Sequence, residues 1–228
     1  MSVQQWITPL QGLDSLRQTE VPMPTPSQGE VLVEIHAVSL NYRDVEGEYK
    51  HHKASEQDAT LVPCSDMCGV VTHVGTGVTK WAVGDRVLST CFPDHLTGQI
   101  TEKELSRSLG SPQDGVLATH RVFPEYALIK APDYLSDQEA STLPIASVTA
   151  WMSINGMRPM GQSGGKGEYV LFQGTGGVSI AGLQIAKASG AKGEVQSKLE
   201  KTHQLRWPSS DHHLLQRGEI GAGKTVGC

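Results

Sequence analysis

The chain has 228 residues, with a hydrophobic content of 38%, a charged content of 19% and a formal net charge of −5. This composition suits one or two soluble domains rather than a disordered chain. The acidic balance gives no basic footprint for nucleic acid, and no run of about 18 apolar residues predicts a membrane span. The N-terminus lacks the pattern of a secretory signal, and the four cysteines lack disulfide or zinc-ribbon spacing. We therefore expect a cytoplasmic protein.

The first ~130 residues are typical of short strands separated by turns, which predicts a small β-barrel or sandwich. Residues 31–38 alternate in polarity, so that four apolar side chains would share one face: Val31, Val33, Ile35 and Ala37. A second strand-like run covers residues 69–74. Three prolines between residues 22 and 26 predict an extended linker, and the polar residues 97–115 predict a long loop.

A helix is predicted to begin after Ser136, because Ser136 to Glu139 has the pattern of an N-terminal cap. The helix would carry apolar residues at helical spacing: Ala140, Leu143, Ala146, Val148 and Trp151. Pro144 would bend this helix or delay its start.

Residues 168–190 predict a strand, a glycine-rich turn and a helix. Such a turn lets the backbone approach a pyrophosphate, whose charge is attracted by the free N–H groups at the start of the helix. The third glycine of the strict dinucleotide fingerprint is replaced by Ser179, so a glycine-rich turn without a ligand remains an alternative.

An ordered series of short motifs carries a family resemblance over roughly residues 1 to 192: Gly29–Val33, Asn41–Asp44, Pro63–Val71, Val83–Val87, Phe123–Tyr126, Glu139–Trp151 and Gly174–Ala191. The chain resembles the medium-chain dehydrogenase/reductase superfamily, in its zinc-independent quinone-oxidoreductase-like branch. It looks closest to fungal proteins labelled zinc-type alcohol dehydrogenase-like.

The resemblance implies a fold of the α/β plus β class. A chaperonin-10-like β-barrel would cover residues 1–135, and the start of a truncated Rossmann domain would cover residues 136–192. The implied activity is the reduction of a small carbonyl compound, a quinone or an activated alkene with NADPH or NADH, of which NADPH is favoured.

The resemblance also implies the site residues. Asn41 and Tyr42 would face the nicotinamide, because an amide can donate a hydrogen bond to a developing oxyanion and a phenol can donate a proton. A half-buried barrel residue is the alternative for Tyr42. The cofactor would lie against Thr149, from the Thr-Ala-Trp motif, and against the glycine turn: Gly174, Thr175, Gly176, Gly177 and Val178.

No zinc is expected. Zinc-dependent relatives have a cysteine ligand where this chain has Asn41, and a Gly-His-Glu motif where it has Cys64-Ser65-Asp66. The substitutions remove two of about three protein ligands that a catalytic zinc needs. The four-cysteine structural zinc lobe of the family is also missing, since Cys91 stands alone in that region.

Residues 193–228 depart from the family, because the apolar run of the second Rossmann strand is absent after Lys192. We expect this tail to be disordered, as a result of a gene-model error or frameshift, and the chain to be weakly active or inactive. A non-catalytic remnant with a folded barrel is one alternative. A small-molecule substrate is expected, with no nucleic acid or membrane partner and a homodimer if the protein is full-length.

The tail also contains the Walker A pattern GxxxxGK[ST] at Gly218 to Thr225. A phosphate-binding loop needs a buried strand before it and a helix after it, and neither is predicted here. A P-loop nucleotide binder is therefore the less favoured alternative.

Overall fold

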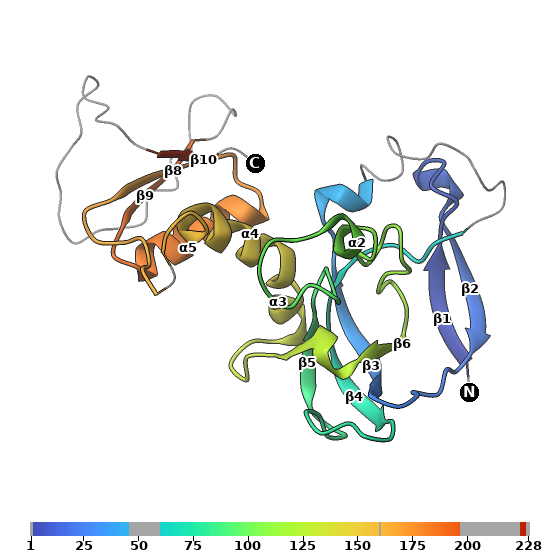
Figure 1. Ribbon diagram of the computed structural model, residues 1–228. Helices are drawn as coiled ribbons and strands as arrows, with labels where there is room; N and C mark the ends of the chain where they lie inside the picture. The colour runs from blue at the N-terminus through green and yellow to red at the C-terminus, as the bar shows by residue number, and fades with distance from the viewer. Residues whose placement is uncertain (1, 46–59, 160, 197–223, 227–228) are drawn as a thin grey trace. The chain divides into compact units, whose positions relative to one another are not determined.

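The computed structural model describes residues 2–45, 60–159 and 161–196 and the backbone of residues 224–226 (Figure 1). The chain divides into two compact units, Met1–Ile145 and Ala146–Cys228. The described residues of the first unit contain seven strands: β1 (Ser2–Ile7), β2 (Arg17–Pro22), β3 (Glu30–Ser39), β4 (Asp66–Val74), β5 (Arg86–Ser89), β6 (His120–Pro124) and β7 (Leu128–Lys130). Its short helical elements are η1 (Leu13–Ser15), residues 42–45, α2 (Glu102–Leu105), η2 (Glu125–Ala127) and α3 (Asp137–Ser141).

Five of these strands form one antiparallel sheet in the order β6-β3-β4-β5-β7. The predicted strand of residues 31–38 is confirmed as β3, and the run 69–74 is the second half of β4. The register between β3 and β4 shifts twice, between Leu32 and Val33 and between Ile35 and Ala37. Such irregularities bend a strand and help a sheet to curl.

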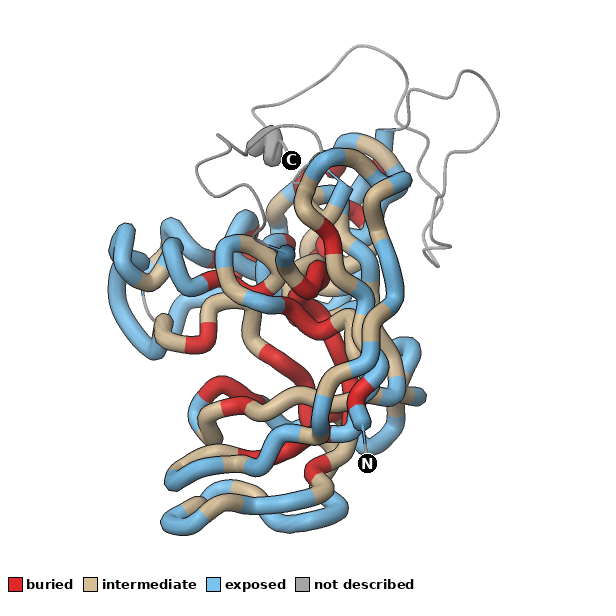
Figure 2. The backbone as a smooth tube through the Cα atoms, turned by 90° about the vertical axis from the view of Figure 1, so that its right-hand side faces the viewer, coloured by how far each residue is buried: buried red, intermediate tan, exposed pale blue. Residues whose placement is uncertain are grey.

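The core of the first unit lies against this sheet and contains ten buried residues: Val31, Val33, Cys64, Met67, Val71, Val87, Leu109, Val116, Phe123 and Leu128. In Figure 2 the buried segments run through the interior, while the connecting loops are exposed. Two members of this core, Leu109 and Val116, lie within or directly after the stretch that the sequence predicts as a polar loop.

The strands β1 and β2 form a separate antiparallel pair that the sequence did not predict. Backbone hydrogen bonds connect β1 to the segment just before β6, since Trp6 N donates to Leu117 O and Thr119 N donates to Gln4 O, at 2.9 and 2.8 Å. The pair thereby extends the hydrogen-bonded structure beyond the main sheet.

The predicted helix cap at Ser136 is confirmed as a capping box, in which Ser136 and Glu139 exchange hydrogen bonds. The helix itself is divided in two. α3 ends at Ser141, and α4 (Pro144–Asn155) begins at the proline, where a missing N–H costs nothing.

Asp137 anchors α3 to the sheet. Its carboxylate accepts hydrogen bonds from Arg86 Nε and Nη2 at 3.0 and 2.7 Å, and it lies 2.9 Å from His36 Nδ1. The Arg86 guanidinium holds the pKa of Asp137 below its ordinary value. This contact and the packing of Ala140 against Cys68 and Leu88 keep α3 within the first unit.

The second unit contains the greater part of α4, then β8 (Tyr169–Gln173), α5 (Gly177–Ala188), β9 (Lys192–Gln196) and β10 (Lys224–Val226). The strand and helix predicted around the glycine turn are β8 and α5. The three strands form a parallel sheet in the order β10-β8-β9, and α5 packs on β8 and β9. Its buried core is Ile154, Val170, Phe172, Ala186 and Val195.

The expectation that no second Rossmann strand follows Lys192 is wrong. β9 pairs with β8 along its whole length, from Tyr169↔Lys192 to Gln173↔Gln196. Val195 is the buried hydrophobic side chain of β9, and the backbone hydrogen bonds to β8 hold the strand in place without an apolar run. A side chain at Gly193 would meet Leu183 of α5 at 2.7 Å, so the glycine lets the helix lie close over the strand.

The backbone of residues 224–226 also forms a strand where the sequence predicts a disordered tail. Residues 197–223, with most of the predicted tail, lie outside the described residues. No helix in the described part of the chain is both long and apolar enough to cross a membrane.

Candidate functional site

The first part of the candidate site is the turn that follows β3. Asn41 precedes a short helical segment, and its backbone N–H donates to Asp44 Oδ2 at 2.7 Å, while Asp44 N donates back to Asn41 O at 3.0 Å. The amide nitrogen Asn41 Nδ2 is buried and has no hydrogen-bond partner among the described residues. Tyr42 is 75% exposed, so it is not the half-buried barrel residue of the alternative interpretation.

One buried and one half-buried carboxyl group, Asp66 and Asp44, lie at this turn. Asp66, at the start of β4, accepts hydrogen bonds from Ser65 Oγ and from Ile145 N, each at 2.9 Å. Burial raises the pKa of Asp66 and that of Asp44, and the hydrogen bonds from Ile145 N and Ser65 act on the pKa of Asp66 in the opposite direction. Since Ile145 is in the first turn of α4, the Asp66 carboxylate also satisfies a helix N–H that has no partner within the helix.

Cys64 has an unusual backbone conformation between these groups. Its φ is +70°, a left-handed value that is uncommon for a residue other than glycine. The segment around residues 109–117 fixes this conformation, because Val116 N donates to Cys64 O at 3.0 Å. Gly110 and Gly115 also lie so close to the Cys64 backbone that an added Cβ would come within 2.9 Å and 1.9 Å of Cys64 O. Such conformations persist where the surrounding structure determines them, and they cluster at functional sites.

The buried cysteines are expected to be unreactive in the folded chain. Burial raises the pKa of Cys64 far above its ordinary value, and burial with the neighbouring Asp137 raises the pKa of Cys68 to about 11. At pH 8 few of these thiols are thiolates, which are the reactive form. We expect iodoacetamide to modify both about 100-fold more slowly in the native chain than in denaturant, by peptide mass spectrometry. The partly exposed Cys91 should react before them, and complete native labelling of Cys64 within minutes would contradict this.

Two of the groups at the turn are not zinc ligands. Asn41 and Ser65 offer an amide and a hydroxyl, whereas protein zinc sites use thiolate, imidazole and carboxylate ligands. No group of three His, Cys, Asp or Glu side chains could hold a metal ion within residues 2–45, 60–159 and 161–196.

The second part of the candidate site is the glycine turn between β8 and α5. Gly174 has a φ of +79°, and a Cβ at Gly174 or Gly176 would meet no atom within 4 Å. No side chain caps the N-terminus of α5 at Gly176. The turn therefore leaves open space beside uncapped N–H groups, which is the arrangement that fits a pyrophosphate. Thr175, Gly177 and Val178 complete it.

Two residues of α5 perform the packing that the third fingerprint glycine provides in the strict motif. Ser179 is buried, and its hydroxyl donates to Gln173 O at the end of β8 at 2.8 Å. One turn later, a Cβ at Gly182 would lie 2.3 Å from the Phe172 ring. Sequence reasoning missed Gly182, although its position one turn beyond Ser179 was the available signal.

The structure shows two further residues of this unit that bear on the cofactor. Thr149, which the sequence predicts beside the cofactor, is exposed on α4. Gln196 ends β9, and Gly174 N donates to its carbonyl oxygen at 2.7 Å. The end of this strand is where dinucleotide-binding folds carry an acidic residue that binds the ribose of NAD. Here the described strand ends in an uncharged amide.

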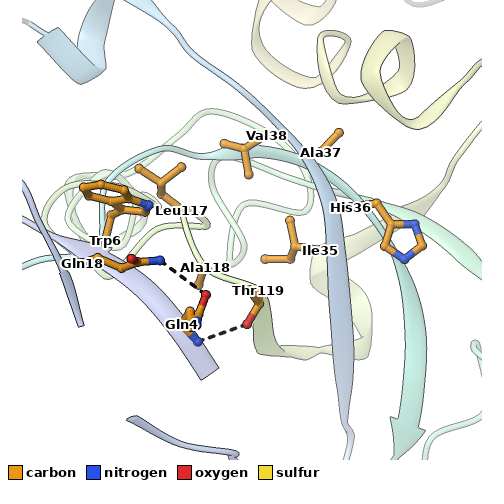
Figure 3. Close-up of a pocket in the computed structure, with 10 residues that line it drawn as sticks. All are labelled: Gln4, Trp6, Gln18, Ile35, His36, Ala37, Val38, Leu117, Ala118 and Thr119. Atoms are coloured by element: carbon orange, nitrogen blue, oxygen red, sulfur yellow. Dashed lines mark hydrogen bonds between the residues drawn. The ribbon is translucent and has the colours of Figure 1, made fainter. Parts of the chain in front are cut away.

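A recess of about 200 Å³ lies elsewhere in the first unit, between β1, β2 and β3 (Figure 3). Its apolar wall includes Trp6, Ile35, Val38 and Leu117, and Gln4 bonds to Gln18 at its edge. None of the predicted site residues lines this recess, so it adds nothing to the candidate site.

The Walker A pattern is not supported by the backbone at its end. Residues 218–223 lie outside the described residues, and Lys224 and Thr225 belong to β10. A phosphate-binding loop requires these two residues to begin a helix.

The comparisons with known proteins agree with the fold. Residues 27–133 match the alcohol dehydrogenase GroES-like domain. The chain is 36% identical over 221 residues to a zinc-type alcohol dehydrogenase-like protein of Schizosaccharomyces pombe, covering 95% of this chain and 59% of that protein. It is 29% identical over 180 residues to the chloroplastic quinone-oxidoreductase QR1 of Triphysaria versicolor, covering 77% of this chain and 49% of that protein.

A solved structure of a protein described as an alcohol dehydrogenase, from Sinorhizobium meliloti 1021, superposes with a TM-score of 0.71 and 39% identity. It is matched over 85% of this chain and 56% of its own length. Residues 27–133 are thus a GroES-like domain of the alcohol dehydrogenase type. The chain belongs to the medium-chain dehydrogenase/reductase superfamily, and the predicted family and fold class are confirmed.

The extent of the match is informative in two ways. The chain spans about half the length of the curated relatives it matches. Because 95% of the chain is covered, the match to the Schizosaccharomyces protein continues past residue 192, where the predicted resemblance ends.

Proposed function

We propose that this chain is an NADPH-dependent oxidoreductase that needs no zinc and reduces a small carbonyl compound, a quinone or an activated alkene. The buried, unpartnered amide of Asn41 carries the proposal. A buried donor without a partner is costly in a folded protein, and a substrate oxygen would supply that partner.

Asn41 and Tyr42 would have different roles at the reacting oxygen, the first as a hydrogen-bond donor and the second as a proton donor. Asn41 Nδ2 donates a hydrogen bond to the oxygen as negative charge develops on it. A nicotinamide cofactor, when bound, would supply the hydride. The exposed Tyr42 hydroxyl then gives its proton to the substrate oxygen, or to the α-carbon of an alkene, and recovers it from solvent.

The glycine turn supports the cofactor part of the proposal. The N–H groups at the start of α5 would bind the pyrophosphate, and Thr149 would lie beside the cofactor. Gln196 has no charge to repel a 2′-phosphate, which favours NADPH over NADH. The absence of zinc, the cytoplasmic location and a homodimer belong to the same proposal.

Fluorescence titration of the purified chain with NADPH, NADH and ATP with magnesium tests this function. Binding of NADPH in preference to NADH supports it. Binding of neither dinucleotide would favour a non-catalytic chain with a folded barrel, and tight binding of ATP alone would favour the Walker A alternative.

Replacement of Tyr42 by phenylalanine tests the proton donor. In a version of the chain extended to the length of its relatives, we expect turnover with an activated alkene or quinone to fall about 100-fold, while the Kd for NADPH stays unchanged, because a proton donor acts mainly in the transition state. Tyr134→Phe is the matched control, since Tyr134 is also exposed in the first unit. Unchanged turnover in Tyr42→Phe would remove this residue from the mechanism.

A further inference from the structure

Residues 91–109 form a lobe that is closed by three contacts, each of which joins two residues that lie between those of the previous contact in the sequence. At its base, Leu109 N donates to Cys91 O at 2.9 Å. Further out, Arg107 Nε lies 2.5 Å from Asp94 Oδ2. Nearer the tip, His95 Nδ1 lies 3.4 Å from Glu104 Oε1. The lobe is therefore held shut by one backbone hydrogen bond and two pairs of ionisable side chains.

Neighbouring groups support both side-chain pairs. Tyr126 Oη lies 3.2 Å from Asp94 Oδ1. Glu104 belongs to a capping box with Thr101 at the start of α2, and those hydrogen bonds hold the pKa of Glu104 below its ordinary value. A pair that belongs to a network stabilises a fold more than an isolated surface pair does.

The side chain of Arg43 links the candidate site to the base of the lobe. Arg43 Nη2 donates to Leu109 O, and Arg43 Nη1 lies 3.4 Å from Ser108 Oγ. The Leu109 side chain is buried in the core of the first unit. Arg43 lies two residues after Asn41, inside the turn that presents the unpartnered amide.

We propose that Arg43 is a positioning residue, and that the lobe of residues 91–109 holds the Asn41 turn in place through it. The guanidinium is a planar fork, so it keeps its two contacts only while Ser108 and Leu109 stay in register. The two side-chain pairs, Arg107 with Asp94 and His95 with Glu104, maintain that register. The catalytic meaning of this coupling rests on the proposed function, whereas the coupling itself requires neither cofactor nor substrate.

The asparagine content of the chain gives a direct test, because Asn41 and Asn155 are the only two asparagines in the sequence. In a chain labelled with ¹⁵N-asparagine, the side-chain amide signals therefore report on one residue in each unit. We expect Arg107→Gln to shift the Asn41 signals and to leave those of Asn155 unchanged. Lys103→Gln removes the same charge from an exposed position in the same lobe and should shift neither.

Arg43→Lys completes the series, since lysine keeps the charge but cannot make both contacts. It should move the Asn41 signals in the same direction as Arg107→Gln. Unmoved Asn41 signals in Arg107→Gln, or equal shifts in Lys103→Gln, would overturn the coupling. No nucleotide is present in these samples, so this failure is distinct from a failure to bind NADPH.

Limited proteolysis tests the closure of the lobe separately. We expect chymotrypsin to cut within residues 96–105 about fivefold faster in Arg107→Gln than in the unmodified chain at low salt. In 1 M NaCl the two should be cut at similar rates, because salt screens partly exposed charges. Equal rates at low salt would show that the charged pairs do not close the lobe.

Discussion

Replacing Gly115 with alanine is expected to destabilise the first unit by about 3 kcal/mol. The added Cβ would lie 1.9 Å from Cys64 O and 2.4 Å from Pro63 O. Both atoms belong to the backbone, so no side-chain rotation relieves the clash, and Gly115 N is itself bonded to Val62 O. We expect the Tm to fall by roughly 10 °C in a thermal melt followed by circular dichroism.

Gly98→Ala is the matched control for this prediction. Gly98 has a φ of +80°, and an added Cβ would meet no atom within 4 Å, so only the backbone conformation resists the substitution. That cost is about 1 kcal/mol. Equal melting temperatures for the two variants would mean that the backbone around Cys64 moves aside at little cost in stability, contrary to the tight packing in the structure.

Replacing Gly176 with aspartate is expected to abolish NADPH binding without destabilising the second unit. A side chain at Gly176 has open space and an ordinary φ of −74°, and aspartate is a favourable residue before a helix. The carboxylate would, however, occupy the place of the pyrophosphate and repel it, which costs several kcal/mol. We expect the Kd for NADPH to rise at least ~100-fold in a fluorescence titration.

Gly176→Asn separates charge from size in this experiment. Asparagine caps a helix as well as aspartate does but carries no charge. NADPH should therefore bind Gly176→Asn more tightly than Gly176→Asp, with equal thermal stability. Equal affinity for the two variants, close to that of the original chain, would place the dinucleotide elsewhere.

Local patterns predict the elements that depend on local forces. The alternation of residues 31–38 predicts β3, the pattern at Ser136 predicts the capping box, and the glycine turn predicts β8 and α5. Each of these signals lies within a few residues, where propensity and capping act directly.

Elements formed by distant partners could not be predicted in this way. One edge of β1 is bonded to residues more than 100 positions away, and β9 is a strand mainly because β8 supplies its hydrogen bonds. The same limit applies to the site. Asn41 was selected from a motif, but the anchoring of Arg43 by Leu109, which is 66 positions away, appears only in three dimensions.

The pairing of β1 with residues 117–119 has a consequence for synthesis on the ribosome. β1 and β2 can pair as soon as both have emerged, because a short connection joins them. The other edge of β1 must wait for about 110 further residues, which takes roughly 5–20 s at ordinary translation rates. During that interval the nascent chain presents an unpaired strand edge, the feature that most readily joins one unfinished chain to another.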